Sequence, residues 1–107
     1  MEEDVRIEFI PREQQNSSYD WANIITGSER AGKARCKIKE DTLIIYSINV
    51  YQDFEGRGFG RQFVEEAKEN FSKIVADRVR QTAIGFWEKL GFVPDKRRTN
   101  WIWTKSP

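Results

Sequence analysis

The sequence predicts an α/β fold of the α+β type, in which a mixed, largely antiparallel central sheet carries flanking helices. Two observations predict this class. Several short segments alternate apolar with polar residues and are rich in β-branched and aromatic side chains, as strands are. Other segments repeat apolar residues at helical spacing. At 107 residues the chain is expected to form one domain, residues 1–107.

The N-terminal segment predicts one strand followed by a polar connection. Apolar and charged residues alternate from Val5 to Phe9, and the pattern stops at Pro11, which predicts a half-exposed strand. Residues 12–20 are polar and show no periodicity, so we expect a loop or one short helical turn there.

The next segment predicts two strands, over residues 21–26 and 33–39, joined by a turn over residues 27–32. Cys36 falls on the apolar face of the later strand, where a buried, unreactive thiol is favoured over a nucleophile because no histidine is available to activate it. The other face either lies in solvent or binds an acidic partner or nucleic acid. Its side chains are all basic: Lys33, Arg35, Lys37 and Lys39.

A run of β-branched and aromatic residues predicts a strand over residues 43–51. Ser47 and Asn49 interrupt one of its faces, and they either line a cleft or meet polar neighbours below a helix. Uninterrupted alternation divides the strand into two faces. These are Ile44, Tyr46, Ile48 and Val50 on one side and Ile45, Ser47, Asn49 and Tyr51 on the other.

A glycine-rich loop leads from this strand into a helix. Gly56, Gly58 and Gly60 let the backbone approach a ligand closely, and Arg57 and Arg61 add positive charge. A helix N-terminus has unpaired N–H groups and a partial positive charge, so it holds anions. The loop therefore predicts either a diphosphate site or a tight turn that binds nothing. The apolar stripe of the helix is Phe59, Phe63, Ala67 and Phe71.

The C-terminal third predicts a short buried strand over residues 73–76, a helix that ends at Gly91, a charged turn over residues 95–100 and a closing strand over residues 101–104. Within the helix, the apolar residues share one face, and core packing is the simplest role for Phe86 and Leu90. This face comprises Ala83, Phe86, Trp87 and Leu90.

The composition excludes several classes of function. Eighteen basic and 17 acidic residues nearly cancel, which argues against binding nucleic acid or a membrane through bulk charge. The chain has no apolar run that could span a bilayer, its charged start is not expected to act as a signal peptide, and one cysteine cannot form an internal disulfide, so we expect a cytoplasmic protein. The lack of histidine excludes histidine bases and histidine-bearing metal sites, and we expect no metal.

Two motifs together resemble the GNAT N-acetyltransferases. The acyl-CoA loop of that family reads Gln or Arg, two residues, Gly, one residue, then Gly or Ala, after a strand that ends in Val. Here Val50 ends the strand and residues 55–60 fill the loop. Residues 80–92 are similar to the family's later helix, which commonly ends Phe-Tyr-Glu-Lys-Leu-Gly-Phe. Two positions depart from the pattern, because Glu55 replaces Gln or Arg and Trp87 replaces Tyr.

The resemblance implies the GNAT fold without most of its first helical region. It also implies that acetyl-CoA is the co-substrate and that its acetyl group passes to a primary amine of a small molecule or protein by direct attack. In the family the central strand splays from its neighbour, and its free backbone groups pair with the pantetheine amides of CoA. The implied cofactor contacts are Ile48, Asn49, Val50, Gly56, Arg57, Gly58, Phe59, Gly60, Arg61, Arg80, Phe86 and Trp87.

The catalytic groups are harder to assign. The resemblance implies that a backbone N–H near residues 49–51 polarises the thioester carbonyl. The base that relatives often carry on this strand is absent, which leaves Glu8, Glu29, Glu55 or a water as alternatives. The indole of Trp87 cannot protonate the leaving thiolate, so the proton comes from water or a tyrosine. The candidate catalytic side chains are Tyr46, Ser47 and Tyr51.

Two other functions stay open. Glu55, Trp87 and the missing base suit an acyl-CoA-binding module without turnover. The basic face of residues 33–39 suits an interaction protein that binds an acidic partner. The short segment at residues 12–20 implies an acceptor site that is open or is completed by another subunit, so a homodimer is also an alternative. The identity of the amine acceptor does not follow from the sequence.

Overall fold

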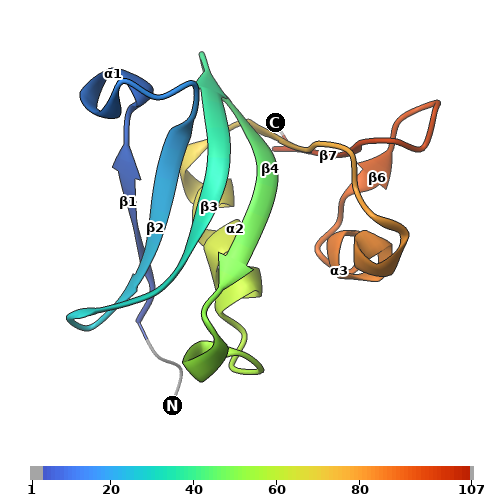
Figure 1. Cartoon of the computed structure of the whole chain (residues 1–107). Helices are drawn as coiled ribbons and strands as arrows, with labels where there is room; N and C mark the ends of the chain where they lie inside the picture. Colours follow the sequence, from blue (N-terminus) through green and yellow to red (C-terminus); the bar gives the residue numbers. More distant parts are fainter. Residues whose placement is uncertain (1–3, 107) are drawn as a thin grey trace.

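The computed structural model describes residues 4–106, and these form one mixed sheet in the strand order β1-β2-β3-β4-β5-β7-β6 (Figure 1). Only β4 and β5 pair in parallel, so the predicted, largely antiparallel sheet is confirmed. The charged start of the chain, residues 1–3, lies outside the described residues. The strands are β1 Arg6–Ile10, β2 Asp20–Thr26, β3 Glu29–Lys39, β4 Thr42–Val50, β5 Lys73–Ala76, β6 Val93–Pro94 and β7 Trp101–Thr104.

The helices are few and short apart from one. The short helical turn expected at residues 12–20 is present as four residues. The helical elements are α1 Arg12–Gln15, η1 Gln52–Phe54, α2 Phe59–Asn70, η2 Gln81–Ala83 and α3 Ile84–Lys89, where η marks a 3-10 turn. None of the helices within residues 4–106 has both the length and the hydropathy that crossing a membrane requires.

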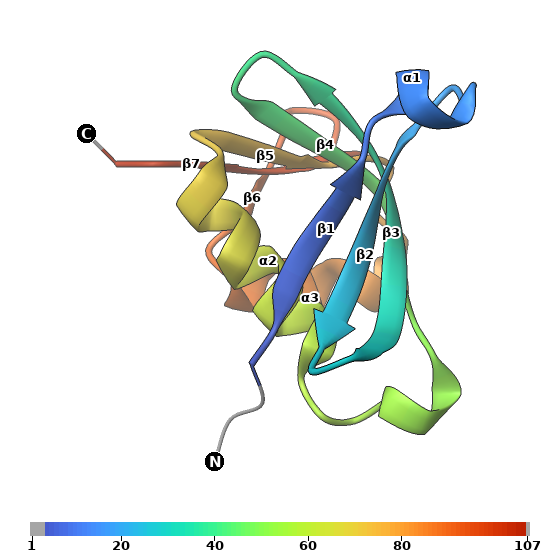
Figure 2. The same ribbon diagram turned by 90° about the vertical axis from the view of Figure 1, so that its left-hand side faces the viewer.

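The α2 helix covers one face of the sheet and closes the core (Figure 2). The stripe predicted from the sequence is confirmed, since Phe59, Phe63, Ala67 and Phe71 are all buried. They pack with apolar side chains of the central strands in one cluster. Burial of a large apolar side chain contributes about 1.5–3 kcal/mol, so this stripe fixes α2 firmly against the sheet.

The turn between β2 and β3 is shorter than predicted. The expected turn over residues 27–32 is wrong, because β3 already begins at Glu29. Gly27 forms the turn with a φ of 59°. Gly32 instead lies within β3, where a Cβ would collide with the carbonyl oxygen of Asn49 on β4. Gly32 therefore marks a close approach of two backbones.

The middle of β4 contains a β-bulge. Ile45 pairs with Cys36 of β3, and Ser47 pairs with Arg35, so Tyr46 is one extra residue on β4. An extra residue shifts the alternation of side chains by one position beyond the bulge. It also turns the second half of β4 away from its original direction.

This bulge overturns the predicted division of β4 into two faces. Ile48 and Val50 pack against the core on the same side as Ile45, although uninterrupted alternation predicts the opposite side. Ser47 and Asn49 lie exposed on the other face. The alternation of core-facing and exposed side chains is regular on each side of the bulge, and the extra residue shifts it by one position.

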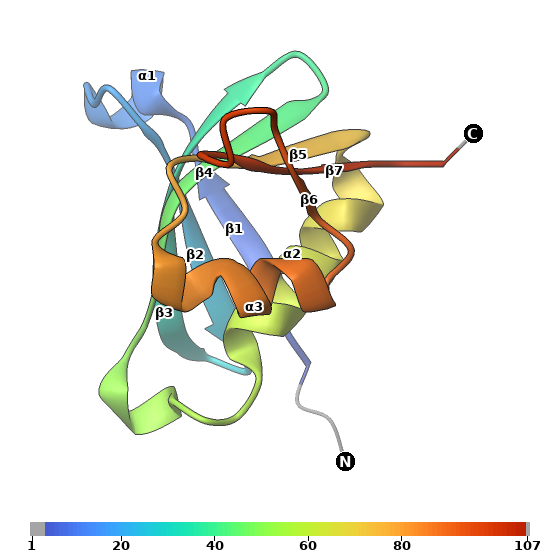
Figure 3. The same cartoon turned by 90° about the vertical axis from the view of Figure 1, so that its right-hand side faces the viewer.

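The α3 helix lies beside α2, on the side of the sheet that α2 covers (Figure 3). Its C-terminus is fixed by Lys68 of α2, whose Nζ donates to the carbonyl of Leu90 at 2.6 Å. The indole Nε1 of Trp101 donates to Glu88 Oε2 at 3.2 Å. Gly91 follows with a φ of 89°, the left-handed conformation predicted for it.

Candidate functional site

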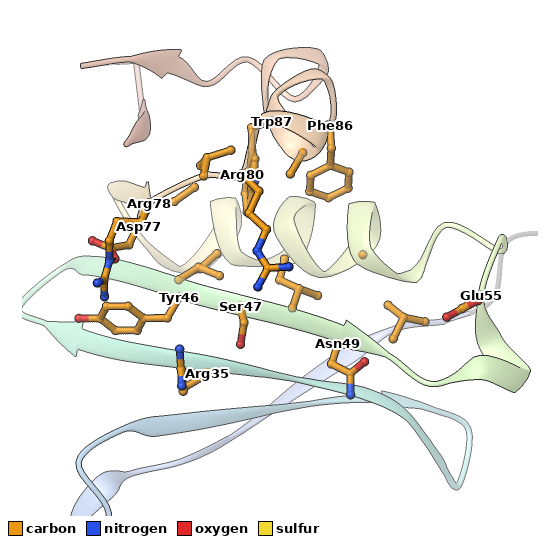
Figure 4. Close-up of a pocket in the computed structure, with 17 residues that line it drawn as sticks. Arg35, Tyr46, Ser47, Asn49, Glu55, Asp77, Arg78, Arg80, Phe86 and Trp87 are labelled. Carbon is orange, nitrogen blue, oxygen red and sulfur yellow. The ribbon is translucent and has the colours of Figure 1, made fainter. Parts of the chain in front are cut away.

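A cleft opens where β4 leaves β5. The two strands pair only between residues 42–45 and residues 73–76, whereas β4 remains paired with β3 up to Val50. The cleft has a volume of about 630 Å³ and lies between β4 and α3 (Figure 4). Its lining residues are Arg35, Ile45, Tyr46, Ser47, Ile48, Asn49, Val50, Glu55, Gly60, Ala76, Asp77, Arg78, Val79, Arg80, Ala83, Phe86 and Trp87.

The second half of β4 presents free backbone groups to this cleft. The N–H of Tyr51 donates to the carbonyl of Ala31 at 2.8 Å, so this pair is hydrogen-bonded. Hydrogen-bonded and non-bonded pairs alternate in an antiparallel ladder, so the N–H and C=O of Ile48 and Val50 point away from β3. The edge can therefore bond an extended chain of amides. The N–H of Tyr51 is already used and cannot polarise a ligand carbonyl.

The N-terminus of α2 forms the end of the cleft next to β4. Gly58 is the N-cap residue with a φ of 82°, and no side chain caps the helix. The N–H of Gln62 donates to the carbonyl of Gly58, which leaves the earlier N–H groups of the first turn without intrahelical partners. Gly60 lies in this turn and lines the cleft. An anion is the natural ligand for such a helix terminus.

The side chains of the glycine loop are placed differently from the sequence prediction. Phe59 is 1% exposed and packs edge-on against Phe54 at 5.7 Å, so its side chain belongs to the core and not to the cleft. The guanidinium of Arg57 lies over both rings, at 5.3 and 5.2 Å. Within the loop, Glu55 and Gly60 line the cleft. Four other predicted contacts do not line it, namely Gly56, Arg57, Gly58 and Arg61.

The α3 side of the cleft carries an aromatic surface. Phe86 is 36% exposed and lines the cleft, so the expectation of core packing is wrong for Phe86 and correct for the buried Leu90. Trp87 is 7% exposed and packs against Phe86 at 5.0 Å and Phe92 at 4.9 Å. Figure 4 shows the Arg80 side chain pointing across the cleft toward β4.

The end of the cleft opposite the N-terminus of α2 contains two polar residues that the sequence did not single out, Asp77 and Arg78, and one that it placed only on the basic face, Arg35. Asp77 directly follows β5, and its Oδ2 accepts from the Nε of Arg78 at 2.8 Å. The signal was present, because ligands commonly bind at the carboxyl end of parallel strands, and Asp77 follows a strand that was correctly predicted.

Tyr46 and Ser47 line this same end of the cleft, as expected for candidate catalytic groups. Burial raises the pKa of Tyr46, and the negative charge of the nearby Asp77 raises it further. The phenol is therefore protonated at neutral pH. Tyr51 does not line the cleft, and its ring lies under the guanidinium of Arg30 at 5.6 Å.

The candidate bases from the sequence, apart from Glu55, and the cysteine lie outside the cleft. Glu8 accepts from Asn23 at 3.1 Å, and Glu29 is exposed at the β2–β3 turn, so of the predicted bases only Glu55 lines the cleft. Cys36 is fully buried, and burial with the nearby Asp20 raises its pKa to about 12, which agrees with an unreactive thiol. Residues 4–106 contain no acidic or cysteine cluster suited to a metal ion.

Comparison with known proteins identifies the family. A family model described as the acetyltransferase (GNAT) domain matches residues 20–94. The chain is 34% identical over 71 residues to an uncharacterised N-acetyltransferase of Shouchella clausii. That match covers 60% of this chain and 42% of the relative, so the match spans less than half the length of this curated protein.

Solved structures share the fold at low identity. The Bacillus subtilis N-acetyltransferase YlbP, solved in complex with coenzyme A, aligns with a TM-score of 0.66 at 18% identity, over 94% of this chain and 97% of that one. A GNAT family acetyltransferase from Elizabethkingia anophelis, solved with acetyl-CoA bound, aligns with a TM-score of 0.61 at 18% identity, over 86% of this chain and 78% of that one. Since the family model covers most of the chain, the chain belongs to the GNAT acetyltransferase family.

Proposed function

We propose that this protein is an N-acetyltransferase that transfers the acetyl group of acetyl-CoA to a primary amine of a small molecule or protein. The observation that carries the proposal is the continuous path from the uncapped N-terminus of α2, along the free edge of β4, to a polar end that contains Asp77. Family membership and relatives that contain CoA or acetyl-CoA support the same activity.

The residues along the cleft suit the successive parts of acetyl-CoA, from its diphosphate to its thioester. The N–H groups at the start of α2 suit the diphosphate. The free N–H and C=O groups of Ile48 and Val50 suit the pantetheine amides, and Phe86 offers an apolar surface on the opposite side. When bound, acetyl-CoA supplies an activated thioester carbonyl. If the pantetheine arm pairs with this edge, the thioester lies near the bulge at Tyr46.

Glu55 is the feature that opposes this arrangement. Its carboxylate lines the cleft at the α2 end, where it repels a diphosphate. Arg80 points into the cleft, and Arg61 lies exposed in the first turn of α2, so both offset the negative charge. We therefore expect binding of acetyl-CoA to be sensitive to salt.

The polar end supplies the groups that acyl transfer needs. Asp77 is placed to accept the proton that the amine loses as the C–N bond forms and the C–S bond breaks. The free N–H of Ile48, which is nearer the bulge than that of Val50, polarises the carbonyl, and the C=O of Ile48 and the groups of Val50 remain for the pantetheine amides. The raised pKa of Tyr46 lies above that of a thiol, about 8.5, so Tyr46 stabilises the leaving thiolate by a hydrogen bond and does not give up its proton.

The test is release of free thiol from acetyl-CoA on addition of primary amines, with the acetylated product identified by mass spectrometry. Asp77→Asn should lower kcat about 100-fold or more, because general-base catalysis contributes at least that factor, and should leave acetyl-CoA affinity unchanged. Asp53→Asn, an exposed change outside the cleft, is the matched control and should keep full activity. An unchanged rate in Asp77→Asn contradicts its role as the base.

A second candidate is an acyl-CoA-binding module without turnover. Trp87 favours it, since a buried indole stands where relatives carry a tyrosine that can donate a proton. Binding of acetyl-CoA without amine-dependent thiol release across the amines tested supports this second candidate over the first.

A further inference from the structure

Arg35 lies at the end of the cleft away from α2. It stands opposite Ser47 in the β3–β4 register, and its side chain lines the cleft. Figure 4 shows it beside Tyr46, at the same end as Asp77 and Arg78, whereas Glu55 lies at the other end. Arg35 therefore lies at the end of the cleft opposite the helix N-terminus that we propose for the diphosphate.

Two aromatic rings fix the guanidinium of Arg35. It lies 4.9 Å from the ring centre of Tyr19 and 5.9 Å from that of Tyr46, and the two rings contact each other edge-on at 5.4 Å. Stacking of this kind holds the plane of a guanidinium in place but uses none of its N–H donors. The guanidinium is thus held in position while the two rings use none of its N–H donors.

The Nε of Arg35 is buried and has no hydrogen-bond partner among the described residues. Its guanidinium also forms no ion pair within residues 4–106, and the carboxylate of Asp77 at the same end of the cleft is bonded to Arg78. A buried donor without a partner is costly unless a ligand supplies an acceptor. The flat fork of an arginine matches the paired oxygens of a carboxylate or a phosphate.

The other cations on this face of β3 are placed differently. Lys33 lies over Trp21 at 5.0 Å and Lys37 over Tyr19 at 5.7 Å, and neither lines the cleft. The basic face predicted from the sequence therefore contributes only Arg35 to the site. Asp77 and Arg35 stand on either side of Tyr46, so one end of the cleft offers a negative group for an amine and a positive group for an anion.

We infer that the acceptor is an amine that also carries a carboxylate or a phosphate, and that Arg35 binds this anionic group while Asp77 faces the amine. The inference rests on the proposed acetyltransferase function and names its substrate class. An α-amino acid, a β-amino acid and a phosphorylated amino alcohol all carry the required pair of groups.

The first test compares matched acceptors in the thiol-release assay. Phenylalanine, β-alanine and O-phosphoethanolamine are each measured against the counterpart that lacks the anionic group: phenylalaninamide, β-alaninamide and ethanolamine. At least one anionic member should have a kcat/KM tenfold or more above its counterpart. In the amide pairs this preference runs against intrinsic reactivity, because an amino amide has the lower amine pKa and more neutral amine. Equal or reversed ratios in every pair overturn the inference.

The second test uses variants. Arg35→Gln should lower kcat/KM for the anionic acceptor at least tenfold, mainly through KM. It should leave unchanged the kcat/KM for the counterpart without the anionic group and the affinity for acetyl-CoA. Lys33→Gln, the matched control on the same face, should behave like the parent. If the parent binds acetyl-CoA and turns over, and Arg35→Gln has the same kcat/KM for the anionic acceptor, this inference alone is overturned. Failure to bind acetyl-CoA overturns the proposed function instead.

A third readout needs no turnover. In ¹⁵N-labelled protein the Nε–H resonance of Arg35, identified by its absence in Arg35→Gln, should move on titration with phenylacetate or inorganic phosphate and stay in place with phenylacetamide. A response to only one of the two anions identifies which group the acceptor carries. No movement with either anion overturns the inference even if none of the amines reacts.

Discussion

Cys36 lies on the core face of β3, where its surroundings set its chemistry. Burial raises its pKa to about 12, against about 8.5 for an unfolded cysteine. Above pH 9 the unfolded chain loses this proton and the folded chain keeps it, so the free energy of unfolding must fall as pH rises toward 12.

The prediction is a steeper alkaline loss of stability in the parent than in Cys36→Ala. The difference in slope should approach about 1.4 kcal/mol per pH unit, since one proton is involved. Urea unfolding of both proteins at pH 8 to 11 measures this difference in slope. The contributions of tyrosines and lysines are the same in both proteins, so they cancel in the difference. Equal slopes contradict the assigned burial of this thiol.

Single residues also show where sequence reasoning stops. The sequence places Gly58 in the loop before a helix and Gly91 at a helix end, and both have positive φ. It places Gly32 in a turn, although Gly32 lies in β3 because β4 approaches it too closely for a side chain. A glycine in the sequence indicates that a Cβ is disfavoured at that position. Only the tertiary structure shows whether the cause is a positive φ or a close neighbouring atom.

Among the elements, α3 depends most on its neighbours. A six-residue helix is too short to be stable alone, so its position on the cleft relies on tertiary contacts. The hydrogen bond from Lys68 to the Leu90 carbonyl, at 2.6 Å, is one of them. It links α2 to the C-cap residue of α3, the helix that carries Phe86 and Trp87.

We predict that Lys68→Met destabilises α3 more than the sheet. The methionine keeps most of the apolar stem but loses a charged hydrogen bond, which contributes about 1.5–3 kcal/mol. Amide hydrogen exchange should speed up in α3 and change little in β3. Lys39→Met, an exposed change at the end of β3, serves as control. Equal exchange in α3 of parent and variant contradicts the role of this contact.

The strands and helices themselves were largely predictable, because turn residues and apolar periods agree along most of the chain. β5 and β7 begin and end where the sequence predicts. The bulge at Tyr46 was not predictable, since no local signal in a regular run of β-branched residues marks an extra residue. The two faces of β4 beyond it were consequently assigned wrongly, although residues 48–50, which were expected to contact the cofactor, do line the cleft.

At the scale of the whole molecule, the cleft joins both halves of the chain. Its walls come from β3 and β4, from α2, and from the segment between β5 and α3. The helix N-terminus at the glycine loop and the open edge of β4 followed from motifs local in sequence. The polar end did not, because Arg35 and Asp77 are brought together only by the order of strands in the sheet.

A ligand held across these elements should stabilise the entire described fold. At 100 times its dissociation constant, acetyl-CoA contributes about 2.7 kcal/mol to the free energy of unfolding. For a domain of this size, that corresponds to a rise of roughly ten degrees or more in the unfolding midpoint.

The most direct test is the shift in unfolding midpoint on addition of acetyl-CoA, measured for the parent, Gly60→Glu and Gln14→Glu. A Cβ at Gly60 has room, 3.7 Å from the Phe86 ring, and an acidic residue in the first turn favours α2, so Gly60→Glu should fold. Its carboxylate occupies the anion position, whereas Gln14→Glu adds the same charge on exposed α1. We expect the full shift in the parent and in Gln14→Glu and its loss in Gly60→Glu. No shift in the parent, or the same shift in all three proteins, contradicts binding of acetyl-CoA at the N-terminus of α2.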